Sequence, residues 1–177
     1  KQTAHCQNTP MSAPPPLHPP HLHYLLAHQV WARLEGDGSA TVGITQLGIR
    51  LSGEVYMCRA KRVGTEVAQG GTVAVVELSK SVVAVKSPVT GTVVAVNEAL
   101  DERPELVHRD PYGAGWIARL QLADFGHDRA ALLTGGAVAP AMDHHAWLHR
   151  LELVPATAPE ALATAHPLPA RPPAAKP

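Results

Sequence analysis

The chain of 177 residues has few aromatic side chains, and its charged side chains carry no net charge. Aromatic residues make up 4% of the chain, with a single phenylalanine, so Val, Leu and Ala must fill its core. Fifteen Lys and Arg balance fifteen Asp and Glu. Without a basic excess to displace counterions from phosphates, we expect no nucleic-acid partner. No run of 18 apolar residues occurs, so we expect no membrane span.

Cysteine is also scarce. Cys6 and Cys58 lie far apart and form neither a disulfide framework nor a C-x-x-C metal motif. The sequence shows no charged start followed by an apolar stretch and a cleavage site, so we expect no secretory signal peptide. A reducing cytoplasm is the compartment that these features predict.

Proline is concentrated near the two ends of the chain. Six of the 17 prolines lie within residues 10–20 and seven within 155–177. Proline lacks an N–H and fixes φ, which disfavours helix interiors and sheets. We therefore predict disordered tails over 1–22 and 155–177 around one domain, 23–154. His18 and His21 in the first tail, with His23 beside it, are of a metal-ligating type, but a flexible segment offers no fixed coordination geometry.

The middle of the chain reads as β-structure. Short segments rich in β-branched residues, punctuated by glycine and proline, predict strands near 41–44, 53–57, 72–76, 82–85 and 92–96. This spacing favours a sandwich or barrel. Helices are predicted near 46–52 and 139–151, the second with Met142, Trp147, Leu148 and Leu151 near one face. Trp31 and Trp116 are predicted to anchor the core, and Cys58 to be a buried apolar filler.

Two similar segments flank one lysine. Residues 63–76 and 82–97 each read as strand, glycine turn, strand, and Lys80 lies between them with Ser79 and Ser81 on either side. This pattern predicts a hairpin tip from which the amine projects into water, where an enzyme can reach and acylate it. Taken alone, a lysine in a hairpin turn is more often a solubilising residue. Lys86, beside a strand end, is the rival candidate, and the near-symmetry favours Lys80.

Longer motifs make a family resemblance specific. The chain resembles the H protein of the glycine cleavage system and its lipoyl-carrier relatives over roughly residues 29–125. The matching segments are 31–38, 41–45, 51–56, 63–67, 77–80, 88–91, 96–100, 104–107 and, most distinctive, Asp-Pro-Tyr-Gly-Ala-Gly-Trp at 110–116.

The resemblance implies a mainly β fold, a barrel-sandwich hybrid with short helices and a C-terminal helix. It implies lipoate on Lys80, with Glu77, Ser79 and Ser81 in the segment that the attaching enzyme recognises. That enzyme is a lipoate ligase or a lipoyl/octanoyl transferase. The protein would be a carrier and not an enzyme. Its arm would take the aminomethyl group from a pyridoxal-phosphate glycine decarboxylase to an aminomethyltransferase, and dihydrolipoyl dehydrogenase would reoxidise it.

Two departures from the family pattern keep a second role open. The acidic residue that usually precedes the tryptophan is absent from His28-Gln29-Val30-Trp31, and Ala84 stands where an acid usually follows the modified lysine by four positions. H-like relatives carry sulfur intermediates on lipoate for a heterodisulfide-reductase-like sulfur oxidation complex, which is the alternative function. Biotin is less favoured, because biotinyl lysines are normally flanked by Met. A third possibility is an interaction module without lipoate.

Overall fold

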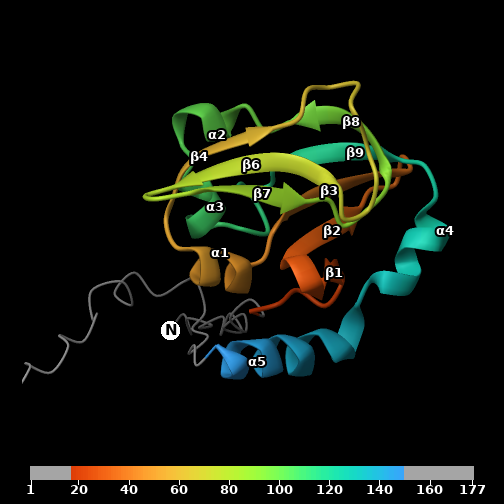
Figure 1. Ribbon diagram of the computed structural model, residues 1–177. Coiled ribbons are helices and arrows are strands. Elements are labelled where there is room, and N and C mark those ends of the chain that lie inside the picture. The colour runs from red at the N-terminus through yellow and green to blue at the C-terminus, as the bar shows by residue number, and fades with distance from the viewer. Residues whose placement is uncertain (1–16, 150–177) are drawn as a thin grey trace, which may run out of the picture.

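The computed structural model of the protein describes residues 17–149, which form two antiparallel sheets (Figure 1). The larger sheet has the order β1-β2-β3-β9-β8-β5 and the smaller the order β4-β6-β7. The strands are β1 (His23–Leu25), β2 (Val30–Leu34), β3 (Ser39–Ile44), β4 (Val55–Ala60), β5 (Glu66–Val67), β6 (Thr72–Leu78), β7 (Val82–Lys86), β8 (Gly91–Val96) and β9 (Ala118–Leu122). The predicted mainly β class is confirmed, and each of the five predicted strands is present.

Short helices connect and flank the sheets. They are the α-helices α1 (Gln46–Ser52), α2 (Ala99–Glu102), α3 (Leu106–Arg109), α4 (Phe125–Asp128) and α5 (Val138–Leu148), and the 3-10 turns η1 (Leu26–His28), η2 (Arg129–Ala131) and η3 (Gly135–Ala137). The Thr45 hydroxyl caps α1 by accepting the Gly48 N–H at 3.0 Å. The helix predicted over 46–52 is confirmed. Within residues 17–149, no helix is long and apolar enough to cross a bilayer.

The main core lies between the two sheets and is built from small aliphatic side chains. Its buried members include Val42 and Val93 of the larger sheet and Val76 of the smaller, and none of them is aromatic. Cys58 belongs to this core at 3% exposure, as predicted, and burial raises the pKa of its thiol to about 12. Small side chains therefore allow the two sheets to close on each other without a bulky filler.

A second cluster holds α5 against the strands. Trp31 is fully buried here, and its indole N–H donates to the carbonyls of Ile44 and Pro111, both at 3.1 Å. Trp116 packs partly buried against the same cluster, so both tryptophans contribute to the core as predicted. The residues of α5 that are buried are Val138, Met142 and Ala146, four apart. The predicted apolar face was wrong in this respect: Trp147 and Leu148 are 72% and 56% exposed, because they follow that stripe by one and two positions. Residues 150–151 lie outside the described part.

The domain begins before the predicted boundary. His18 and Leu22 are buried, at 6% and 1% exposure, and His18 Nδ1 lies 3.3 Å from the Tyr112 hydroxyl. The predicted tail 1–22 is therefore too long at its C-terminal side; residues 1–16 and the predicted tail 155–177 lie outside the described residues. The histidines 18, 21 and 23 form no metal site, since residues 17–149 hold no group of three or more potential ligands.

A buried carboxylate ties α4 to the turn before β8. Asp128, 1% exposed, accepts the Thr90 N–H at 2.5 Å and the Thr90 hydroxyl at 2.9 Å. Gln69 joins this contact, because its side-chain amide donates to the carbonyls of Asp128 and Pro88, both at 2.9 Å. The contact links residues 38 positions apart and fixes the turn that leads into β8.

We predict that Asp128→Asn lowers the free energy of unfolding by about 1–3 kcal/mol, because the amide keeps one acceptor oxygen and both hydrogen bonds from Thr90 lose their ionised partner. Urea unfolding of the variant measures the loss. Glu102→Gln, an exposed acid-to-amide change in α2, is the control and should stay within about 0.5 kcal/mol of the parent. Equal stabilities of the two variants would contradict the stabilising role of the contact between Asp128 and Thr90.

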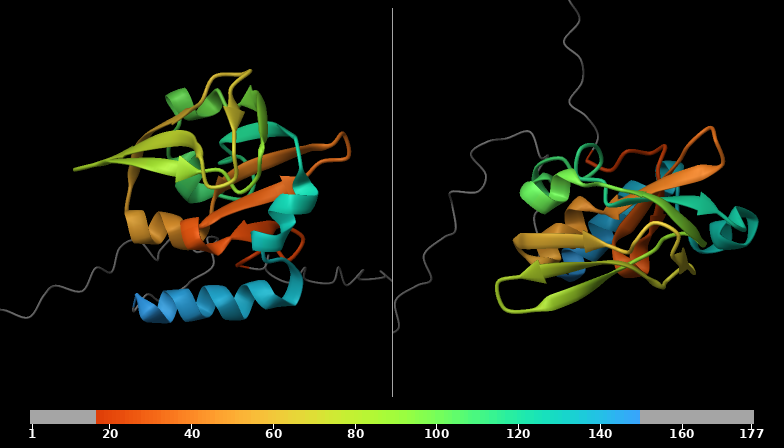
Figure 2. Two further views of the ribbon diagram at one scale, coloured as in Figure 1. Left: turned by 45° about the vertical axis from the view of Figure 1, so that its right-hand side comes forward. Right: turned by 90° about the horizontal axis from the view of Figure 1, so that it is seen from above.

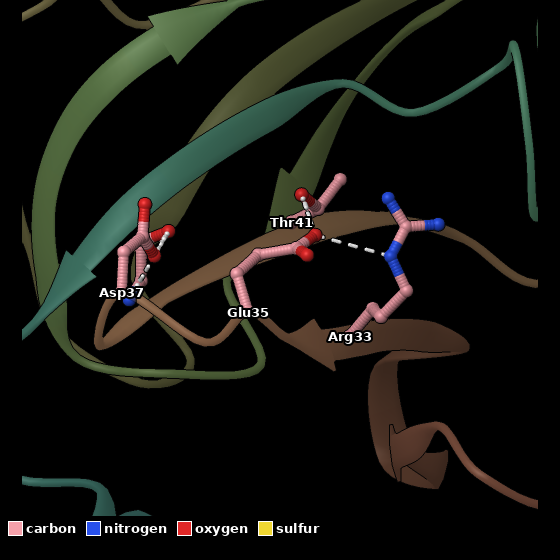
Figure 3. A network of polar contacts seen from close by, with 5 residues as sticks. Arg33, Glu35, Asp37 and Thr41 are labelled. Carbon is pink, nitrogen blue, oxygen red and sulfur yellow. Dashed lines mark hydrogen bonds and ion pairs between the residues drawn. The ribbon is translucent and has the colours of Figure 1, made fainter.

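A polar network stabilises the β2–β3 hairpin (Figure 3). One oxygen of Glu35 accepts the Arg33 Nε–H at 3.0 Å and the Thr41 hydroxyl at 2.7 Å. Asp37 closes the turn by accepting the Ser39 N–H at 3.0 Å and the Ser39 hydroxyl at 2.6 Å. Donation from Thr41 is the main cause that lowers the pKa of Glu35, and Arg33 adds to it.

Because the pKa of Glu35 is lowered in the folded state, its contribution to stability is present above the unfolded pKa and is lost as the pH falls through the folded value. We predict that Glu35→Gln costs about 1 kcal/mol at pH 7. The difference from the parent should vanish in acid, where both chains carry a neutral side chain. Unfolding curves at a series of pH values test this, and a difference that is independent of pH would contradict it.

Candidate functional site

Residues 66–92 form one long folded ribbon centred on Ser79 and Lys80. Strand β6 pairs with β7 from Glu77↔Val82 to Thr72↔Lys86, and β5 pairs with β8 at Glu66↔Thr92. Each residue lies about as far before the centre as its partner lies after it. The near-repeat seen in the sequence is therefore a near-symmetry of the fold. It places the centre of the repeat at the free end of the β6–β7 hairpin, which projects from the body of the molecule (Figure 2).

Lys80 occupies the turn at this end. The Leu78 N–H donates to the Ser81 carbonyl at 2.8 Å, which leaves Ser79 and Lys80 as the two central residues of the turn. Lys80 is exposed and makes no hydrogen bond or ion pair with any residue of 17–149. Its amine is therefore accessible and uncommitted.

The other lysines of the described range are placed differently. Lys86, the rival candidate, is half-buried at the opposite end of β7, and its Nζ lies 3.5 Å from the Thr72 hydroxyl. Lys61 follows β4, and its N–H donates to the Val73 carbonyl. Neither lies in a hairpin turn, so Lys80 alone among them combines an open amine with a tip position.

The other predicted site residues surround Lys80 in sequence and in space. Glu77 pairs with Val82 at the last rung before the turn, and its side chain is exposed. Ser79 and Ser81 flank the lysine and are exposed too. The hairpin thus presents one acid and two hydroxyls beside the amine, on a surface that a modifying enzyme can cover.

The base of the tip is held from the neighbouring strand. Val55 of β4 pairs with Leu78, and its N–H donates to Nε2 of His108 in α3 at 2.7 Å. Because Nε2 of the neutral His108 ring is an acceptor here, its proton lies on Nδ1. The ladder shifts register at Tyr56, which is 55% exposed. Sequence reasoning did not place His108 beside the hairpin, because the partner N–H lies 53 residues away.

The two departures noted in the sequence have clear structural positions. Gln29 is 8% exposed and adopts a positive φ of 54°. Its side-chain oxygen accepts the Thr45 hydroxyl at 2.8 Å and its nitrogen donates to the Leu26 carbonyl at 3.1 Å. Ala84 is exposed on β7, opposite Val75. The Gln29 amide is thus occupied in holding η1 to α1, and Ala84 offers no polar group.

Known proteins resemble the chain over most of this domain. The family model described as "Glycine cleavage H-protein" matches residues 22–145. A glycine cleavage system H protein of Aeromonas hydrophila is 44% identical over 108 residues, 61% of this chain and 83% of the relative. Glycine cleavage system H protein 2 of Aquifex aeolicus is 39% identical over 117 residues, 66% of this chain and 73% of the relative.

A solved structure agrees with the fold. The crystal structure of a glycine cleavage system H protein from Mycobacterium marinum superposes with a TM-score of 0.58 at 28% identity, covering 76% of this chain and all of that one. The expected barrel-sandwich architecture is therefore confirmed. The family match spans both sheets, the projecting hairpin and most of α5. On these grounds the chain belongs to the glycine cleavage H-protein family.

Proposed function

We propose that the chain is a lipoyl carrier whose lipoate is attached to Lys80. The observation that carries the proposal is an exposed lysine without any partner in residues 17–149, at the turn on which the whole 66–92 ribbon is centred, in a chain of this family. Acylation of this amine breaks no contact of the fold. Glu77, Ser79 and Ser81 are the side chains that we expect the attaching ligase or transferase to read.

The attachment step uses only Lys80 from this chain. Its deprotonated amine attacks a lipoyl carbonyl already activated by the separate ligase or transferase, an amide forms, and the activating group leaves. The side chain thereby loses its positive charge and becomes a long neutral tether. When attached, lipoate would supply a disulfide ring that opens to give one sulfur bonded to the aminomethyl group and one thiol; the protein supplies presentation.

In this proposal the chain contributes no catalytic group of its own. It docks in turn with a glycine decarboxylase, an aminomethyltransferase and dihydrolipoyl dehydrogenase, and each docking raises the local concentration of the arm at that active site. The hairpin suits this task because its turn lies apart from both core clusters. The expected cytoplasmic location stays a prediction.

Lipoylation itself gives the first test. We expect intact and peptide mass spectrometry of protein made with lipoate and a competent ligase to show one lipoyl-amide increment on the peptide that contains Lys80. Lys80→Arg should abolish the increment. Lys86→Arg, the matched control in the same hairpin, should retain it. An increment on Lys86, or none with several ligases, would contradict the assignment.

The glycine role gives a second test. Fully lipoylated protein should support the exchange of labelled bicarbonate with glycine by glycine decarboxylase, and the Lys80→Arg variant should reduce the exchange to the rate without carrier. Folded, fully lipoylated protein that supports no exchange would rule out the aminomethyl role and leave a lipoyl carrier of another cargo.

A further inference from the structure

A groove of about 390 Å³ lies at the end of β4, away from the hairpin tip. Its charged lining consists of Arg59, Lys61 and Arg62, and the rest is formed by Thr65 and by Ala60, Ala74 and Val75. No acidic side chain is among these lining residues. The groove therefore combines a short apolar floor with three cations.

The three positive charges form no ion pair with any other residue of 17–149. Arg59, Lys61 and Arg62 are all exposed. Within residues 17–149 the one ion pair joins Arg33 to Glu35, in the β2–β3 hairpin. None of the three groove cations donates a side-chain hydrogen bond to a described residue. The total charge of the chain is balanced, yet these three cations form a basic cluster that has no acidic partner within residues 17–149.

The groove continues onto the open face of the smaller sheet. Arg59 pairs with Val75, which pairs with Ala84, so the three form one row across β4, β6 and β7. Arg59 and Ala84 in this row are exposed and Val75 is half-buried, whereas Cys58 and Val76 in the next row are buried in the core. The first row thus faces solvent. In Figure 1, β6 and β7 lie in front, and none of the helices within residues 17–149 covers them.

This face leads directly to the lysine. Val75 lies three residues before the end of β6 at Leu78, or about 10 Å at 3.3–3.4 Å per residue, and Lys80 lies in the turn just beyond. Val82, 66% exposed, lies between them on the adjacent strand and offers an apolar contact. One protein surface can therefore cover the groove and the open face while the arm on Lys80 enters its active site.

We propose that the Arg59–Lys61–Arg62 groove is a docking site for a carboxylate-rich surface segment of the enzyme that loads the arm. The inference rests on the proposed carrier function and goes beyond it by naming the recognition chemistry. Because the net charge of the chain is zero, long-range attraction to a partner must come from such a local cluster. Rim charges of this kind govern mainly the rate of association and its dependence on salt.

A neighbouring cleft gives the partner an orientation. It shares Arg59 and Ala60 with the groove, but its far side carries Glu98 and Asp101. A carboxylate-rich segment is attracted by Lys61 and Arg62. It is repelled at the α2 side of the cleft, where Glu98 and Asp101 lie. The acidic segment therefore has one favourable placement along β4, which fixes the partner relative to the hairpin.

The test compares two double variants with the same change of charge. Arg59→Glu with Arg62→Glu reverses the groove. Arg103→Glu with Arg109→Glu, at exposed positions that follow α2 and end α3, is the matched control.

With lipoylated protein and glycine decarboxylase, the groove variant should raise the KM for carrier about tenfold or more at low salt. The kcat should be unchanged, because Lys80 is intact. The control should leave both parameters near those of the parent. Equal KM values in the two variants would overturn the inference, although the exchange seen with the parent would still support the carrier role.

A second measurement needs no enzyme activity. Titration of the ¹⁵N-labelled chain with a synthetic oligoglutamate peptide should shift the amide signals of Ala60, Thr65 and Val75. The shifts should vanish in the groove variant, persist in the control and weaken with salt. Shifts of similar size around Arg103 and Arg109 would reveal non-specific attraction to any cation and would overturn the proposal. If the parent supports no exchange, the glycine role fails. This titration still tests whether the groove binds a carboxylate-rich segment.

Discussion

The antiparallel register of the 66–92 ribbon is the constraint on which the rest of the structure depends. Successive side chains of a strand point to opposite faces, so a slip of one residue would exchange the core positions of Cys58 and Val76 with the solvent-facing positions of Arg59 and Val75. Burial of Cys58 and Val76 opposes that slip. The same register places Ser79 and Lys80 in the turn. The same residue pairs therefore fix both the position of Lys80 and the closure of the core.

Small side chains make this arrangement possible. The main core is aliphatic, with Val and Ala on both sheets, and its buried members include no aromatic ring. The large residues are separated into the second cluster, where Trp31 and Tyr24 pack with α5 and with Leu22 of the segment before β1. The sheets that carry the hairpin thus close without a bulky filler, while the aromatic residues stabilise the opposite side of the larger sheet.

Structural features that depend on short stretches of sequence were predicted well. The β-branched segments marked the strands, and the near-repeat marked the centre of the ribbon at Lys80 before any pairing was known. Contacts between distant segments left no such signal. Nothing near Asp128 indicated that it accepts the Thr90 N–H, and nothing near His108 indicated the Val55 N–H. Composition misled on the N-terminal side. Proline suggested a tail through residue 22, yet Leu22 is buried, because apolar burial outweighs the absence of regular structure before β1.

The net charge of zero does not reveal the local cluster of three cations at the end of β4. A net charge of zero argues against a nucleic-acid partner, but it does not describe the separate surfaces that a carrier presents to its enzymes. Attachment of lipoate removes the charge of Lys80, and the three cations at the end of β4 remain. In the proposed function the tip then carries the cargo on a neutral tether, and charged groups at the other end of the same sheet recognise the partner. The groove can therefore hold the partner without contacting the turn that bears the arm.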